Sequence, residues 1–149
     1  MPTKKTTEKA RADLRRGKSP TTAAGEFVRE EIDHVREGKH GARSTKQAIA
    51  IGLSKARRAG VPLPPPKPGR TSPRTRKAAQ QAYETGQGRR KPRAPSAKRS
   101  AAAERALKRE PRAAASHQSL AKQAKSAARA RGQQTTSRKK STSTRRRSR

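Results

Sequence analysis

Large apolar residues are too few in this chain to build a core for all of it. Leu, Ile, Val and Phe number twelve among 149 residues, and Trp is absent. Chains in which these four residues make up less than roughly 20% and the net charge is high are usually disordered. The formal net charge here is +31. We therefore expect a mostly disordered chain. Only a piece of about 40 residues can fold, a size that commonly needs an oligomer or a ligand.

The large apolar residues that do occur are concentrated in residues 21–61, which we expect to form an α-helical hairpin. Nine of the fourteen apolar residues larger than alanine lie between Phe27 and Leu63. A first helix is predicted at about 24–37, where apolar residues recur at helical spacing on one face: Ala24, Phe27, Val28, Ile32 and Val35. Its acids are expected on the opposite, solvated face: Glu30, Asp33 and Glu37.

A second helix is predicted at about 45–59, and its boundaries are the clearest in the sequence. Ser44 followed three residues later by Gln47 matches a capping box. Gly60 stands where a left-handed C-cap is wanted, and Pro62 prevents continuation. The apolar residues of this helix form one stripe along it, Gly52 lies on that stripe, and its lack of a side chain permits close approach of the first helix. A homodimer through the hairpin is one way to complete so small a core.

The segments on either side of the hairpin are expected to be disordered. Residues 1–20 form a basic arm, 62–69 a polyproline linker and 70–149 a long cationic arm of Ala, Lys and Arg. Capping residues and prolines predict nascent helices in the long arm at about 73–84, 100–109 and 116–131. None of these has an apolar face to bury, so each should fray in solution.

Most of the positive charge belongs to the long arm. Between Pro62 and Arg149 there are 26 Lys or Arg and three acids. A polycation of this density needs a polyanion, and nucleic acid is the commonest in cells. Duplex DNA is favoured over RNA, because recognition of single strands depends on aromatic stacking and the arm offers Tyr83 alone. The residues expected to contact phosphates are Arg43, Lys46, Arg57, Arg58, Arg70, Arg74, Arg76, Lys77, Arg89, Arg90, Lys91, Arg93, Lys139, Lys140, Arg145, Arg146 and Arg147.

Catalytic and metal chemistry find little support in the sequence. Cysteine is absent, which excludes disulfides and thiolate ligands. His34 and His40 with Glu37 do not predict a metal site, since one histidine falls on a helix and the other in a glycine loop beside cations. No nucleophile–base set or phosphate-binding glycine loop can be assembled. We expect no enzyme and no cofactor, and no apolar run predicts a membrane span.

The run from Ser44 to Gly60 resembles a family of small basic bacterial proteins. That family is defined by a domain of unknown function with a Lys-Gln-Ala-Ile-Ala-Ile core, which stands here at residues 46–51. The likeness covers about residues 26–64 and implies a bacterial source and a helical module, but no activity. The long arm is similar in composition to the tails of bacterial histone H1-like proteins.

The sequence thus predicts a nucleoid-associated, histone-like protein of the cytoplasm. It would neutralise the phosphates of duplex DNA without sequence preference. Two other functions stay open at this point. One is a ribosome-associated or rRNA-binding protein, because basic arms also suit structured RNA. The other is an adaptor whose hairpin binds a protein partner while the arm localises it.

Overall fold

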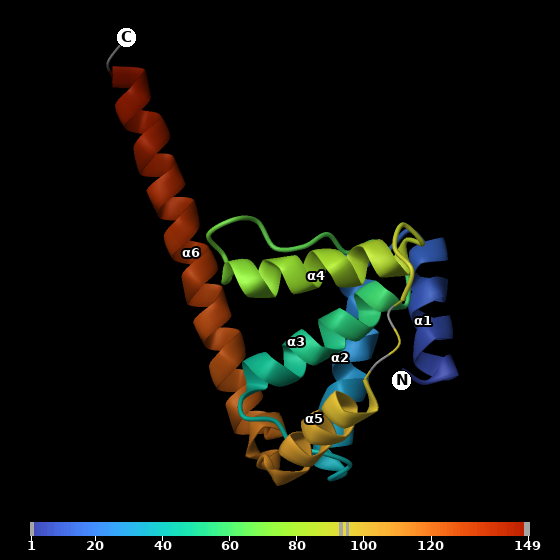
Figure 1. The fold of residues 1–149 in the computed structure, drawn as a ribbon. Coiled ribbons are helices and arrows are strands. Elements are labelled where there is room, and N and C mark those ends of the chain that lie inside the picture. The colour runs from blue at the N-terminus through green and yellow to red at the C-terminus, as the bar shows by residue number, and fades with distance from the viewer. Residues whose placement is uncertain (1, 93, 95, 148–149) are drawn as a thin grey trace. The chain divides into compact units, whose positions relative to one another are not determined.

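Helices extend through most of the chain in the computed structural model, which describes residues 2–92, 94 and 96–147, with side chains as far as Gly132. The elements in order are α1 (Lys4–Arg15), α2 (Pro20–Arg36), α3 (Thr45–Arg58), α4 (Pro73–Gly86), α5 (Ala97–Arg109), a short 3-10 helix η1 (Arg112–Ala115) and α6 (His117–Arg147) (Figure 1). They form two compact units, Met1–Ala115 and Ser116–Arg149. The expectation of a mostly disordered chain is therefore wrong.

The hairpin expected from the sequence is formed by α2 and α3. Ser44 Oγ accepts a hydrogen bond from Gln47 N–H at 3.2 Å, as the capping box predicts. The Gln47 side chain in turn accepts from the amide of Arg43 at 2.8 Å. At Gly52 the two helices nearly touch, because a Cβ there would lie 2.7 Å from the Cα of Val28. A glycine in α3 is what allows this approach.

Residues 1–20, expected to be a disordered arm, instead contain α1, which packs on α2. The N-cap of α1 is Thr3, and the backbone N–H of Thr3 donates to Glu30 Oε1 of α2 at 2.8 Å. Ala10 of α1 joins a cluster centred on the fully buried Phe27. This segment is ordered because small residues of α1 such as Ala10 pack against α2, although α1 has only one large apolar residue, Leu14.

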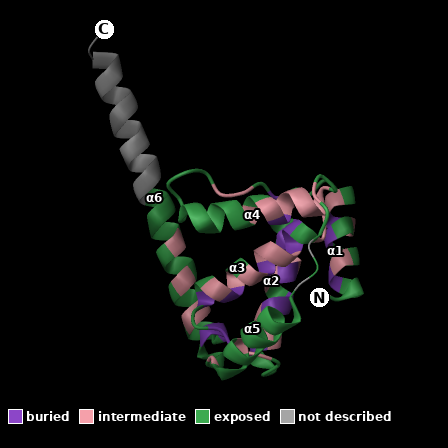
Figure 2. Cartoon of the chain, in the orientation of Figure 1, coloured by how far each residue is buried: buried purple, intermediate pink, exposed green. Residues whose placement is uncertain are grey.

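Alanine explains how so few large apolar residues can build this fold. Among the residues whose side chains are described, thirteen apolar ones are buried, and nine of these are alanines. A short side chain lets helix backbones approach closely, so dense packing is reached with little side-chain volume. Counting large apolar residues therefore underestimated the core. Figure 2 shows that the buried positions gather where α1, α2 and α3 face one another.

The proline-rich segment and α4 cover the other side of α3. Val61 and Leu63 are buried, so the start of the proline-rich segment is part of the core. The guanidinium of Arg57 donates to the carbonyl oxygens of Leu63 at 3.1 Å and Pro64 at 3.2 Å. The end of α4 lies against the end of α3, since a Cβ on Gly86 would overlap the carbonyl of Arg57.

The segment from the end of α5 to η1 returns to the hairpin and builds a second core cluster. Ala114 and Ala115 pack with Val35, Ala42 and Ala48, and Ile32 lies at the edge of this cluster. Backbone hydrogen bonds join the loop between α2 and α3 to this segment, from Gly41 N–H to the Leu107 carbonyl at 2.8 Å and from Ala42 N–H to the Pro111 carbonyl at 3.2 Å. The chain itself thus covers the hairpin. A homodimer was expected because the core of an uncovered hairpin is small.

The remaining helices are the most exposed. All three predicted nascent helices correspond to observed ones, α4, α5 and α6. In α5, every described side chain before Leu107 is exposed (Figure 2). No helix among the described residues combines the length and the apolarity that crossing a bilayer requires.

Candidate functional site

Acidic side chains are gathered on α2, and two of them lie inside the protein. Glu30 and Glu31 are both buried, and Glu31 is fully so. The ammonium of Lys55 on α3 donates to Glu31 Oε2 at 2.5 Å. The sequence analysis placed Glu30 on a solvated face. Instead, the N-terminus of α1 covers Glu30 through the amide of Thr3.

Two half-buried histidines form a cluster with the buried Glu31. His40 Nε2 lies 3.3 Å from Glu31 Oε1, and His34 is on α2 one turn beyond Glu30. The imidazole rings of His34 and His40 are 6.2 Å apart and almost perpendicular. One ligand atom from each of Glu31, His34 and His40 lies within 4.8 Å of the others. We call these three residues the carboxylate–histidine cluster.

Burial and charge decide the protonation of His34. Its pKa is lowered from the ordinary 6.5, first by loss of hydration and then by the positive charges of Lys39 and Lys55. The imidazole is therefore neutral at neutral pH. Glu37, the acid that the sequence analysis considered beside the histidines, is exposed and pairs with Lys39 at 2.8 Å. That hydrogen bond lowers the pKa of Glu37.

The cations expected to contact phosphates on the hairpin have different environments. Lys46 and Arg58 are exposed, and so is Arg43, whose Nε lies 3.6 Å from Glu110 Oε1. Arg57 is only 7% exposed, and desolvation lowers the pKa of its guanidinium. Because the side chain is buried and two of its N–H groups donate to backbone carbonyls, Arg57 holds the proline-rich segment against α3 and is poorly placed to contact a phosphate.

Among the cations expected beyond the proline-rich segment, most of those that the structure describes are on the surface. Around α4 the exposed ones are Arg70, Arg74, Arg76, Lys77, Arg89 and Lys91, and Arg90 is half-buried. An open hollow of about 370 Å³ on α4 is lined by three of these cations, Arg76, Lys77 and Arg90. Others fall outside the residues whose side chains are described: Arg93, Lys139, Lys140, Arg145, Arg146 and Arg147.

The structure adds a regularity that the sequence analysis missed, since three of the described helices begin with a pair of exposed cations. After its N-cap Thr3, α1 starts with Lys4 and Lys5. The first turns of α4 and α5 carry further pairs, Arg74 and Arg76 in α4 and Lys98 and Arg99 in α5. The described helices have no acid in any first turn. A Ser or Thr cap followed by Lys or Arg at the first or second helical position is the signal that could have found these positions.

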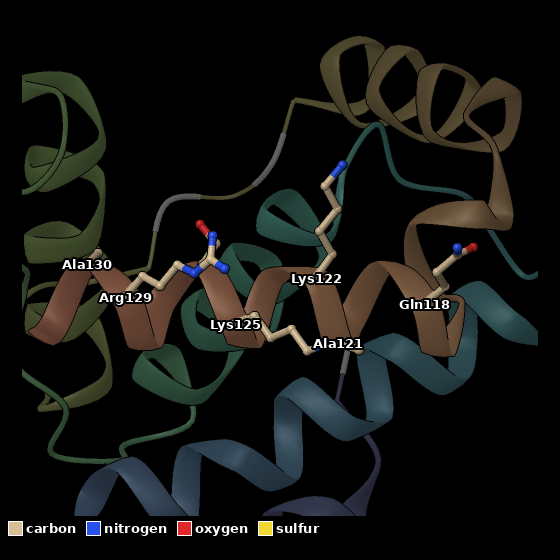
Figure 3. A pocket seen from close by; sticks show the side chains of 7 residues that line it. Gln118, Ala121, Lys122, Lys125, Arg129 and Ala130 are labelled. Carbon is tan, nitrogen blue, oxygen red and sulfur yellow. The ribbon is translucent and has the colours of Figure 1, made fainter.

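The described part of α6 presents a further row of cations. Lys122, Lys125 and Arg129 recur at helical spacing and project from successive turns (Figure 3). A hollow of about 670 Å³ follows this side of α6, lined by Gln118, Ala121, Lys122, Lys125, Ser126, Arg129 and Ala130. From His117 to Gly132 the sequence contains no acid. This helix face is suited to an anionic partner.

Fold and surface together define a small, strongly basic all-α protein with a buried acidic cluster. Residues 4–67 match the model of a family of unknown function, DUF6496. This match confirms the likeness to such a family and extends it to include α1. No curated protein sequence and no solved structure matches the chain.

Proposed function

We propose that this protein binds the phosphate backbone of nucleic acid without sequence preference, with duplex DNA as its partner at the nucleoid. One observation carries the proposal: exposed cations occupy the first turns of α1, α4 and α5. The free N–H groups of a helix start already carry partial positive charge, so cations there cost stability. A chain that places them there repeatedly has prepared sites for anions.

The geometry of a helix start suits a phosphate. Backbone N–H groups point out of the first turn, and the helix dipole favours negative charge there. In α4 the Ser72 hydroxyl accepts one of these groups, the amide of Thr75. The neighbouring side chains of Arg74 and Arg76 are exposed. A phosphate at this position would interact with both guanidinium groups and with the helix dipole.

The preference for duplex DNA rests on what the surface lacks. Tyr83, the aromatic residue of the long arm, is half-buried in α4 and is poorly placed to stack on a base. Contacts to phosphates position a protein on a duplex but carry no sequence information directly. The buried acids also support the proposal, because Glu30 and Glu31 are withdrawn from the surface that would face phosphates.

The test is the salt dependence of binding by the full chain to a duplex of random sequence, followed by fluorescence anisotropy. If about 6–10 phosphates are contacted, affinity should fall by about 10³–10⁵-fold between 50 and 200 mM salt. Affinity that stays flat over this range would defeat the proposal. A competition between duplex DNA and rRNA at physiological salt decides the partner. Preference for rRNA would replace DNA by a ribosomal partner.

A matched pair of variants tests whether the helix starts are the contact points. Arg74→Gln/Arg76→Gln removes two exposed charges from the first turn of α4, and Arg15→Gln/Arg16→Gln removes two from the end of α1. The first should reduce the slope of log K against log salt by about 1.8, or about 0.9 for each lost phosphate contact. The second should reduce it less. Equal effects would mean that total charge alone matters.

Stability distinguishes the same two variants independently of DNA. Removing cations from a helix start relieves repulsion with the dipole, by about 0.3–1 kcal/mol for each charge, whereas removing them from a helix end loses a favourable interaction. Arg74→Gln/Arg76→Gln should therefore raise the urea midpoint, and Arg15→Gln/Arg16→Gln should lower it. Changes of the same sign in both would contradict the role assigned to the dipole.

A further inference from the structure

The carboxylate–histidine cluster brings a ring nitrogen of His40 close to a buried carboxylate oxygen of Glu31. The Nδ1 of His40 lies 3.1 Å from the carbonyl oxygen of Gly41. A carbonyl can only accept, so Nδ1 must carry the proton of this hydrogen bond. In a neutral imidazole the lone pair is then on Nε2, and Nε2 faces Glu31 Oε1 at 3.3 Å. A proton on Nε2, or a metal ion bound by both atoms, would satisfy this pair.

The two buried glutamates are incompletely satisfied. Glu31 Oε1 and Glu30 Oε2 are buried and have no hydrogen-bond partner among the described residues. Leaving an acceptor buried and unpaired costs about 1–3 kcal/mol, and more for a charged group. Lys55 occupies only the other oxygen of Glu31. The Lys55 ammonium therefore leaves Oε1 of Glu31 without a hydrogen bond.

We propose that Glu31, His34 and His40 bind a divalent transition-metal ion, with zinc as the best match. Two imidazole nitrogens and one carboxylate oxygen are a ligand set typical of zinc. Hard cations such as Mg²⁺ prefer oxygen ligands and fit this set poorly. Three protein ligands leave the fourth tetrahedral position to water. The ion would be held by Nε2 of His40, Oε1 of Glu31 and a ring nitrogen of His34, which lie close enough together to share it.

The surroundings of the ligands match those of metal sites. A metal-bound histidine usually donates its other N–H to a carbonyl or carboxylate, which fixes the ring and its tautomer. Gly41 provides that carbonyl for His40. Gly41 is itself held, because its amide donates to Leu107 and a Cβ on it would overlap the backbone of Glu110. The loop that carries His40 is thus fixed by the end of α5 and by the residue that follows this helix.

The ion would join two parts of the fold. Glu31 and His34 belong to α2, whereas His40 belongs to the loop between α2 and α3. All three ligands lie within residues 4–67, the part that matches the family of unknown function. Metal binding is therefore a property of the helical module, and it does not depend on the proposed nucleic-acid binding.

Titration calorimetry tests the proposal on the untagged full chain after treatment with a chelator and dialysis. Zinc chloride should bind with a stoichiometry of one. His40→Gln and His34→Gln should each lower the affinity by at least about 100-fold, since even second-shell changes cost about 10–100-fold. His117→Gln, which changes the exposed histidine at the start of α6, is the matched control and should bind as wild type does. The absence of binding by wild type, or equal loss in the control, would overturn the proposal.

A spectroscopic measurement on the unaltered protein guards against variants that fail to fold. The chain has three histidines, so their imidazole NMR signals are easily resolved. Zinc should shift the signals of His34 and His40 and leave those of His117 unchanged. If zinc moves none of the three, a protonated His40 held by Glu31 accounts for the cluster, and the metal proposal is wrong.

Discussion

Lys55→Met is the substitution that most directly tests how the module tolerates acids in its interior. The Glu31 carboxylate is fully buried, and its shortest contact is the Lys55 ammonium at 2.5 Å. Removing that partner leaves a buried negative charge without compensation. Losses of this kind cost about 3–5 kcal/mol. Because whole domains are stable by only about 5–15 kcal/mol, the variant should be close to unfolding.

Urea and thermal unfolding followed by far-UV circular dichroism, with a chelator present, measure this cost. The loss corresponds to a fall in Tm of roughly 10–30 °C for a unit of this size. Lys39→Met is the matched control, because its pair with Glu37 has both side chains more than half exposed. It should change Tm little, since solvent and salt screen such pairs. Equal shifts in Tm for both variants would refute the assignment of Glu31 and Lys55 as a buried pair.

A double variant and a metal addition sharpen this result. Glu31→Leu/Lys55→Met removes both charges, and replacing a buried pair by apolar residues is often neutral or stabilising. The double variant should therefore be more stable than Lys55→Met alone. Zinc, as the proposed ligand of Glu31, should restore part of the Tm of Lys55→Met, because a ligand that binds only the folded state stabilises it.

Two further predictions concern the fold. Gly52→Ala should lower the urea midpoint, because the new Cβ would lie 2.7 Å from Val28 Cα and 3.0 Å from the Phe27 carbonyl oxygen. These are backbone atoms and cannot move aside independently. Overpacking of this kind costs about 1–3 kcal/mol, and the roughly 1 kcal/mol gain in helix propensity offsets this cost only in part. Truncation after Ala115 should preserve a cooperative unfolding transition. Truncation after Gly69 should lower Tm sharply, because it removes α4 and η1, which pack on the hairpin. Equal Tm values for the two fragments would contradict the packing of these elements on α3.

Helix boundaries could be predicted from the sequence because their signals are local. Ser44 caps α3 as its spacing to Gln47 predicts. Gly38 and Gly60 have φ of 76° and 92°, the left-handed conformation that a glycine after a helix end adopts readily. The close approach at Gly52 also followed from its place on the apolar stripe. Each of these features is determined by a few neighbouring residues.

The packing of the flanking segments could not be predicted, because its contacts leave little trace in the sequence. The segment after α5 is held through backbone groups, such as the carbonyls of Leu107 and Pro111, which any residue would offer. Two side chains add to this, the Thr45 hydroxyl donating to Ala114 and the Arg36 guanidinium to Ala115. Neither position stands out as a long-range contact among so many Thr and Arg residues.

Glu31 shows a signal that was present but was not used. It lies four residues after Phe27 and four before Val35, both fully buried, and therefore in the middle of the apolar face of α2. An acid at such a position must be paired in the folded state. The sequence analysis considered Glu37 beside the histidines, because Glu37 is near His34 and His40 along the chain, but it is Glu31 that contacts His40.

The two proposals can fail independently, because the charges that they involve are separated by burial. A zinc ion would change a net charge of +31 by two, at a position next to the buried Glu31. The exposed cations at the helix starts would keep their full charge. We therefore expect the affinity for duplex DNA, and its salt dependence, to be nearly the same with zinc and with a chelator. A large loss of DNA affinity on metal removal would mean that the ion holds the nucleic-acid interface in shape, and the separation argued here would be wrong.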